Sequence, residues 1–273
     1  MLIADAHVHI HDCFDLSLFL GAAFSNFRHA ALRIYCDRTY IPVLLLTEGR
    51  GQRVFRRLSE GTEKGKDAIG QGSGGIFQFY PTGEPESLRI ENGERQSLFL
   101  VSGRQIMTAE RLEVLALSTV SEVPDGLTLE KTVVAVEKEG ALPVVPWGFG
   151  KWSGRRRRVL MQYLASRREG VFFLGDNGGR PNFLRFPDFQ RKTPGGSLKV
   201  LPGSDALPLP SELKKVGSFG FTLEEELDPR RPGDALKRIL SNPGVVPIPY
   251  GPPESITRFA RNQMILRIWK HRI

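Results

Sequence analysis

The chain has 273 residues, of which 40% are hydrophobic and 25% are charged, with 38 lysines and arginines against 30 aspartates and glutamates. This composition excludes a globally disordered chain. The net charge of +8 is carried mostly by 27 arginines and favours an anionic partner, although a solvated basic surface explains the same excess. Because Cys13 and Cys36 are the only cysteines, a disulfide scaffold and a tetrathiolate zinc site are both excluded.

The sequence carries no signal for a membrane partner. No apolar run approaches the roughly 18 residues that cross a bilayer. The first five residues, Met-Leu-Ile-Ala-Asp, lack the basic and then apolar layout of a signal peptide. We therefore expect a cytoplasmic protein. Since chains of roughly 200 to 250 residues often fold as one α/β domain, the length does not require two domains.

The first part of the chain alternates predicted strands and helices. Residues 1–10 place apolar and polar side chains on opposite sides with a period of two, which indicates a strand. An apolar-rich stretch that starts at Asp15 predicts a buried helix, with Asp15 as its N-cap. Residues 42–47 predict a strand covered on both faces, and a polar helix is expected at 51–59. This order is typical of a parallel α/β fold.

The next part of the chain interrupts that order. At about 62–102, short apolar stretches predict antiparallel strands with a hairpin turn at Asn92-Gly93. Further strands are expected at 112–117, 142–145, 171–174, 199–201 and 216–221, and helices at 128–139, 155–168, 234–240 and 254–269. We interpret the pattern as an α/β fold, a (β/α)7-like distorted TIM-type barrel. We expect this barrel to form a single domain over residues 1–273, with an antiparallel β insertion at about 62–102.

The sharpest chemical signal is the sequence from Asp5 to His9. His7 and His9 lie two residues apart on one strand, so their side chains point to the same side and can reach one metal ion. Asp5 is placed to fix the orientation of an imidazole ring as a hydrogen-bond acceptor. The alternative is a strand end whose polar side chains are only hydrogen-bonded. We favour the metal because polar residues that face a barrel interior need a partner that offsets their desolvation.

This motif, together with Gly-Ser-Asp-Ala at 203–206, resembles the polymerase and histidinol phosphatase (PHP) family of metal-dependent phosphoesterases and, more distantly, the amidohydrolase barrels. Further segments stand in the places of other family motifs: 46–48, 103–106, 112–114, 125–130 and 140–145. Leu-Thr-Glu at 46–48 stands where the family usually has a Thr-Asp-His triplet. The segment 103–106 stands where the family usually has a glutamate ligand. The resemblance covers most of the chain apart from the antiparallel insertion.

Two departures from the family pattern limit the expected metal content. The strand that ends in His-Pro in the family ends here in Pro146-Trp147, and the final Asp-x-His is here the sequence Asp-Ala-Leu at 205–207. The resemblance therefore implies one or two divalent ions (zinc, manganese or iron) and excludes a trinuclear site. The expected metal ligands are His7, His9, Glu48, Asp176 and Asp205.

Carboxylates at strand ends are also the expected catalytic groups. Asp205 and Glu113 are the candidates, since a carboxylate next to a metal can take a proton from water that the ion acidifies. A capping role is the alternative for Asp205. For Glu48, Glu113 and Asp176 the alternative is an ordinary solvated or capping residue.

Two glycine-rich segments are candidates for substrate recognition. Residues 148–154 lead into a helix that begins with four arginines, so backbone N–H groups, Lys151 and Arg155 can converge on one anion. A solvated basic run is the alternative. Residues 175–180 form a polar turn whose amides, together with Arg180, can cradle a phosphate. The glycine spacing of this second segment matches neither a P-loop nor a dinucleotide fingerprint, so we expect no nucleotide cofactor.

These features predict a metal-dependent hydrolase, specifically a phosphoesterase that acts on a small anionic molecule through a metal-activated water. Two other hypotheses stay open. The reduced set of histidines also fits a barrel that has lost catalysis and serves as a binding or regulatory module. The basic surface fits nucleic-acid binding, but aromatic residues do not interleave with the basic run, so this hypothesis ranks last.

Overall fold

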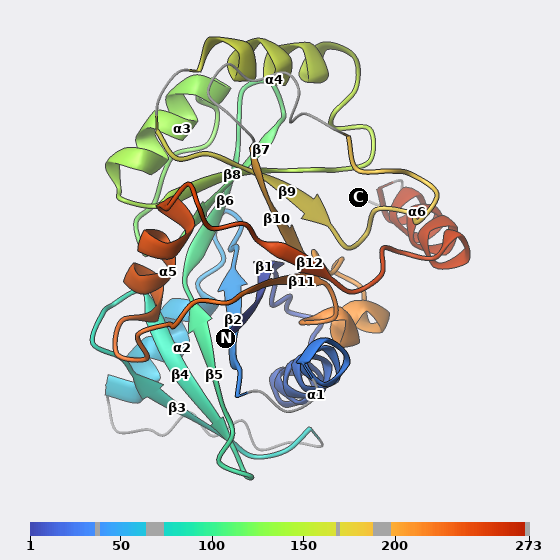
Figure 1. The fold of residues 1–273 in the computed structure, drawn as a ribbon. Coiled ribbons are helices and arrows are strands. Elements are labelled where there is room, and N and C mark those ends of the chain that lie inside the picture. Colours follow the sequence, from blue (N-terminus) through green and yellow to red (C-terminus); the bar gives the residue numbers. More distant parts are fainter. Residues whose placement is uncertain (36–38, 64–73, 168–169, 188–197, 271–273) are drawn as a thin grey trace.

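The computed structural model describes residues 1–35, 39–63, 74–167, 170–187 and 198–270 (Figure 1). The strands are β1 (Leu2–Val8), β2 (Ile41–Leu46), β3 (Phe77–Pro81), β4 (Ser87–Asn92), β5 (Ser97–Val101), β6 (Gly103–Met107), β7 (Glu113–Leu117), β8 (Leu142–Pro146), β9 (Phe173–Asn177), β10 (Lys199–Gly203), β11 (Gly220–Leu223) and β12 (Ile248–Tyr250). The helices are α1 (Leu16–Tyr35), α2 (Val54–Glu63), α3 (Leu129–Lys138), α4 (Gly154–Ser166), α5 (Pro232–Ser241), α6 (Ile256–Lys270) and the 3-10 helix η2 (Pro210–Lys215).

The strands form two mixed sheets. The larger sheet has the order β12-β11-β1-β2-β5-β4-β3, and the smaller sheet has the order β10-β9-β8-β7-β6. The pairs β1–β2, β2–β5, β8–β9 and β9–β10 are parallel. The remaining pairs are antiparallel, including β6–β7 and β7–β8 in the smaller sheet and β1–β11 in the larger one.

The predicted (β/α)7-like TIM-type barrel is therefore wrong. A barrel of that type needs parallel strands that close on themselves, whereas six of the strand pairs found in the described residues run antiparallel and the strands divide between two sheets. The misleading signal is burial: β7 and β8 are buried along their whole length. A strand covered on both faces has the same continuous apolar sequence whether its neighbours are parallel or antiparallel.

The sheets and helices stack in four layers (Figure 1). Helices α1 and α2 cover the outer face of the larger sheet, and α3 and α4 cover the outer face of the smaller sheet. Between the sheets lies an apolar core to which both contribute, and β1 shows how this arises. Its Ile3 packs against the α1 side, while its Leu2 and Ala4 face the core between the sheets.

The two sheets approach each other most closely where β1 and β2 end. On one side, the Asp205 backbone N–H donates to the His7 carbonyl at 2.8 Å. A Cβ on Gly203 would lie 2.2 Å from the His7 nitrogen, so only glycine permits this approach. On the other side, a Cβ on Gly103 would lie 2.5 Å from the Leu46 carbonyl oxygen. Two glycines thus bring the ends of β10 and β6 next to the ends of β1 and β2.

Several local predictions agree with the structure. Asp15 caps α1, because its Oδ1 accepts the Leu18 N–H at 2.9 Å. The antiparallel strands predicted within 62–102 are β3, β4 and β5, and β5 joins the larger sheet beside β2. Part of that predicted insertion, residues 64–73, lies outside the described residues. Strand β6 has no counterpart among the predicted strands.

In the described part of the chain, no helix is long and apolar enough to cross a membrane.

Candidate metal site

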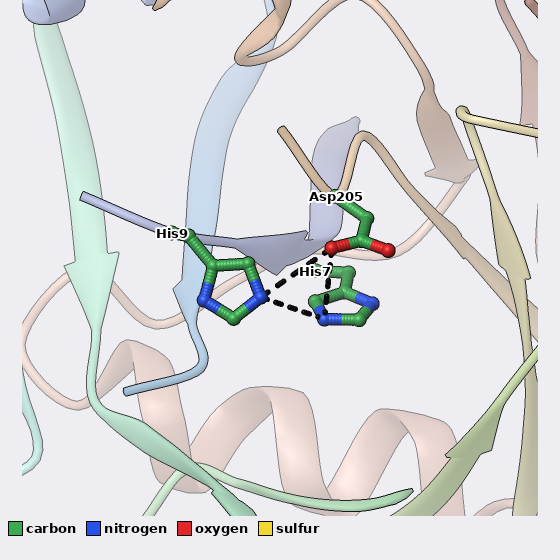
Figure 2. Close-up of side chains that lie close together, drawn as sticks. All are labelled: His7, His9 and Asp205. Carbon is green, nitrogen blue, oxygen red and sulfur yellow. Dashed lines mark hydrogen bonds and ion pairs between the residues drawn. The ribbon is translucent and has the colours of Figure 1, made fainter. Parts of the chain in front are cut away.

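His7 and His9 meet through their ring nitrogens at the end of β1 (Figure 2). The two Nε2 atoms are 3.0 Å apart. Both side chains are buried, with His7 3% and His9 8% exposed. The spacing of two residues along the strand directs both rings to the same side, as the sequence motif predicts.

Asp205 completes the cluster from the segment that follows β10 (Figure 2). Its Oδ1 lies 3.5 Å from Nε2 of His7 and 3.4 Å from Nε2 of His9. The residue has a positive φ of 44°, a left-handed conformation that aspartate tolerates better than most residues. This turn of the backbone is held by the hydrogen bond from the Asp205 N–H to the His7 carbonyl. The structure thus brings together three of the residues that the sequence singles out.

The cluster fits a divalent cation. Its three potential ligand atoms are imidazole nitrogens and a carboxylate oxygen, all within 4.8 Å of one another. In a tetrahedral site with bonds of about 2 Å, neighbouring ligand atoms are about 3.3 Å apart, and the distances here lie between 3.0 and 3.5 Å. The amide oxygen Oε1 of Gln105, on β6, lies 3.1 Å from the His7 Nε2 and adds a fourth potential donor.

Electrostatics favour the protonation states that a metal requires. Burial lowers the pKa of His7 and outweighs the opposing effect of Asp205, so the ring is neutral at pH 7. Burial tends to raise the pKa of Asp205, but His7, His9 and Lys151 hold that pKa well below its ordinary value. A neutral imidazole and an ionised carboxylate are the forms that bind metal.

Asp5 has a different role from the predicted one. Its carboxylate binds backbone instead of an imidazole ring: it accepts N–H groups from His7 at 3.2 Å, Ser204 at 2.8 Å and Gly217 at 2.8 Å. The side chain is fully buried, and burial raises its pKa to about 6. His7 Nδ1 is buried and has no hydrogen-bond partner among the described residues. Asp5 therefore ties together the backbone segments that carry His7 and Asp205.

Two of the expected metal ligands, Glu48 and Asp176, lie outside the cluster and have arginine partners. Glu48 accepts the Phe55 N–H at the start of α2 at 3.0 Å, and its other oxygen accepts Nη1 of Arg104 at 3.1 Å. Asp176 forms a two-point ion pair with Arg180, with distances of 2.7 and 2.8 Å. Both carboxylates are buried and compensated by a guanidinium, which explains their burial without a metal.

Of the three predicted substrate-binding residues, only Lys151 acts on the cluster. Lys151 pairs with Glu113 through Nζ and Oε1, and the charges of this pair reach the cluster, acting on Asp205 and His7 respectively. Arg155 is exposed in the first turn of α4, and no contact with the cluster is found for it among the described residues. Arg180 is 8% exposed and is engaged by Asp176 and by the Leu184 carbonyl.

The backbone amides of the predicted phosphate cradle at 175–180 have partners within the protein. The N–H groups of Gly178 and Gly179 are already engaged, the first by the Gly203 carbonyl at 2.8 Å and the second by Oδ1 of Asn177 at 2.6 Å. The Arg180 N–H donates to the Asn177 carbonyl at 2.8 Å. These amides hold the turn itself, so they do not face a ligand.

Three residues that the motifs do not identify contact the cluster. Gln105 binds His7, and Asn177 donates from Nδ2 to Oδ2 of Asp205. His11 stacks on His9 with ring centroids 5.3 Å apart, and its Nε2 donates to the Ala206 carbonyl at 2.8 Å. The resemblance of segment 103–106 to the family's glutamate-ligand segment is the one signal that points to Gln105.

Two cavities adjoin the cluster. One, of about 430 Å³, reaches Gln105 and is also lined by Arg50 and Arg104. The other, of about 280 Å³, reaches His11 and is also lined by Arg57 and by apolar side chains. Basic and acidic side chains therefore share the walls of both cavities, with Glu48, Glu122 and Asp125 in the first and Asp12 in the second.

No protein-family model matches the chain, and no curated protein matches it. Similar solved structures include PsfC from Pseudomonas syringae PB-5123, with 15% identity and a TM-score of 0.47 over 98% of this chain and 97% of that chain. They also include endonuclease Q in complex with a 27-mer duplex that has an abasic lesion at the active site. This structure has 11% identity and a TM-score of 0.46 over 89% of this chain and 57% of that chain. A third is the lesion-specific endonuclease PfuEndoQ from Pyrococcus furiosus, with 11% identity and a TM-score of 0.48 over 91% of this chain and 58% of that chain. The chain thus spans less than two thirds of the length of the endonuclease Q chains.

Proposed function

We propose that this protein is a metal-dependent hydrolase that binds one divalent cation and cleaves a phosphate ester. The observation that carries the proposal is the convergence of Nε2 of His7, Nε2 of His9 and Oδ1 of Asp205 within 3.5 Å of one another. Buried polar groups that converge in this way need a shared partner, and a cation provides one.

The cation is held by His7, His9 and Asp205, with the amide oxygen of Gln105 as a further donor. Zinc, manganese and iron all accept imidazole and carboxylate ligands. When bound, the ion supplies Lewis acidity, which polarises a phosphoryl oxygen and makes nearby water more acidic. One ion is proposed instead of two because Glu48 and Asp176, the other expected ligands, are paired with Arg104 and Arg180.

The residues around the cluster provide the remaining parts of a hydrolytic site. Lys151 keeps 33% of its side chain exposed while its charge acts on Asp205, so it can neutralise a substrate anion at the cluster. Its partner Glu113 is buried beside it, and we assign to Glu113 the proton that water loses as it attacks phosphorus. Arg50 and Arg57 lie on the walls of the two adjoining cavities, but these walls also carry acidic side chains, so we assign the binding of the anion to Lys151.

The test is hydrolysis of p-nitrophenyl phosphate and bis(p-nitrophenyl) phosphate by protein that has been stripped with a chelator and reloaded with zinc, manganese or iron. We expect release of p-nitrophenol that depends on the metal and is reduced at least 100-fold in His9→Ala. Gln78→Ala, an exposed substitution on β3, is the control and retains activity. Metal-loaded protein that leaves both esters intact would contradict the catalytic part of the proposal and favour a binding role.

A further inference from the structure

A cavity separate from the metal cluster lies between α1 and the chain around β12. Its volume is about 550 Å³, within the usual range for a small-molecule site. In Figure 1, α1 is the blue helix below β11 and β12. The residues that line the cavity are Asn26, His29, Ala30, Arg33, Ile34, Ser218, Pro249, Tyr250, Gly251 and Pro252.

Among the residues that the structure describes, the lining has positive and apolar parts but no carboxylate. His29 and Arg33 are four residues apart on α1, so both side chains lie on the same face of the helix. Ala30 and Ile34 lie beside them, and Pro249 and Pro252 form the opposite apolar wall. Ile34 is 38% exposed and adds an apolar side chain to this wall. The other cavities described here each include at least one acidic residue.

Hydrogen bonds hold the two walls in place. Nδ2 of Asn26, on α1, donates to the carbonyls of Lys214 at 2.9 Å and Val216 at 2.8 Å, which fixes α1 to the chain that leads into the opposite wall. The Tyr250 hydroxyl donates to the Gly217 carbonyl at 3.0 Å. These contacts tie both walls of the cavity to the segment from Lys214 to Gly217.

We propose that this cavity binds a small amphipathic anion, that is, a molecule with one carboxylate, phosphate or sulfonate group and a flat apolar body. Arg33, supported by His29, binds the anionic group, and the apolar body packs between Ile34 and the two prolines. A guanidinium binds such groups in a fixed fork, and none of the described residues of the lining is acidic. The site goes beyond the proposed hydrolase, because no residue of the lining belongs to the metal cluster.

The experiment compares two fluorescent probes that have almost the same apolar body. The first, 8-anilinonaphthalene-1-sulfonate, carries an anionic group, and the second, N-phenyl-1-naphthylamine, is neutral. We expect the folded full chain to bind one equivalent of the sulfonate in a saturable titration. Arg33→Ala weakens binding of the sulfonate about tenfold and leaves binding of the neutral probe unchanged. Ala30→Trp, which fills the cavity, weakens binding of both probes.

Two controls locate the site. Arg28→Ala removes an exposed arginine of α1 that does not line the cavity, and it leaves binding of both probes unchanged. His9→Ala, which removes a candidate metal ligand, also leaves probe binding unchanged, so failure of the proposed hydrolase does not affect this result. Equal effects of Arg33→Ala and Arg28→Ala would overturn the proposal. Loss of sulfonate binding in His9→Ala, or no saturable binding at all, would overturn it too.

Discussion

Asn177 donates a hydrogen bond from Nδ2 to Oδ2 of Asp205, which leaves Oδ1 of Asp205 to face the two histidines. Asn177 is itself fixed, because its Oδ1 accepts the Gly179 N–H at 2.6 Å and its Nδ2 also contacts the Trp147 carbonyl at 3.3 Å. The end of β9 therefore orients the carboxylate that follows β10, its parallel neighbour. Residues that orient a metal ligand in this way tune the affinity of the site.

Replacement of Asn177 should weaken metal binding without removing a ligand. We expect Asn177→Ala to lower the affinity for Co²⁺ about tenfold, because the Asp205 carboxylate is then free to rotate away from the histidines. Isothermal titration of the chelator-treated protein measures this affinity. Asn182→Ala, at an exposed position in the next loop, is the matched control and should bind Co²⁺ like the unchanged protein. Equal affinities of the two variants would show that Asn177 does not position Asp205.

Gln105 should act as a ligand and not only as a hydrogen-bond partner of His7. Its Oε1 lies 3.1 Å from His7 Nε2, a distance that suits two atoms bound to the same ion. We expect Gln105→Ala to weaken Co²⁺ binding about tenfold and to change the visible absorption spectrum of the bound Co²⁺, since the set of ligand atoms changes. Gln105→Glu should restore tight binding. A spectrum that is the same in all three proteins would rule out ligation by Gln105.

Glu48 should contribute to stability and not to metal binding. Its carboxylate pairs with Arg104 and accepts the Phe55 N–H, and its side chain is 3% exposed. We expect Glu48→Ala to lower the free energy of unfolding by about 3 kcal/mol, because the variant removes the buried carboxylate that pairs with a largely buried guanidinium and accepts the Phe55 N–H. Urea denaturation measures this change. The affinity of the folded variant for Co²⁺ should equal that of the unchanged protein, and a tenfold loss of affinity would identify Glu48 as a ligand after all.

Asp5 should make stability depend on pH. Burial raises its pKa in the folded protein from 3.8 to about 6, so the folded state holds the proton more tightly than the unfolded state. The stabilisation that protonated Asp5 gives the folded state is therefore fully present below about pH 4 and is lost as the pH rises through about 6. This loss lowers the free energy of unfolding by about 3 kcal/mol. The measurement is urea denaturation of the metal-free protein and of Asp5→Asn between pH 4 and pH 7. As the pH rises, the free energy of unfolding of the unchanged protein should fall relative to that of Asp5→Asn by about 3 kcal/mol. A difference between the two proteins that stays constant with pH would contradict the raised pKa of Asp5.

The sequence predicts the chemistry at the end of β1 better than it predicts the fold. Alternation along residues 1–10 is a local property of a strand, so it places His7 and His9 on the same side whatever the strand pairs with. Strand direction is not local. Strands β7 and β8 are buried on both faces, and nothing in their apolar sequences distinguishes antiparallel from parallel neighbours. The barrel prediction fails at this point.

The same distinction explains why two of the predicted ligands lie outside the cluster. Glu48 follows β2 and Asp176 lies near the end of β9, as metal ligands often do, but their partners decide their roles. Arg104 is 56 residues from Glu48, and only the bridge between the end of β2 and β6 brings the two together. Gln105, on the same short strand as Arg104, faces His7 for the same reason. Contacts between the two sheets are set by the fold and leave no periodic signal in the sequence.

The central claim is that His7, His9 and Asp205 hold one divalent cation. The most direct measurement is a Co²⁺ titration of the chelator-treated protein, followed by metal analysis of the dialysed complex. We expect one equivalent of bound metal in the unchanged protein and in Gln78→Ala, and at least a 100-fold loss of affinity in Asp205→Ala and in His9→Ala. Folded protein that retains no metal, or an Asp205→Ala variant that binds Co²⁺ as tightly as the unchanged protein, would contradict it.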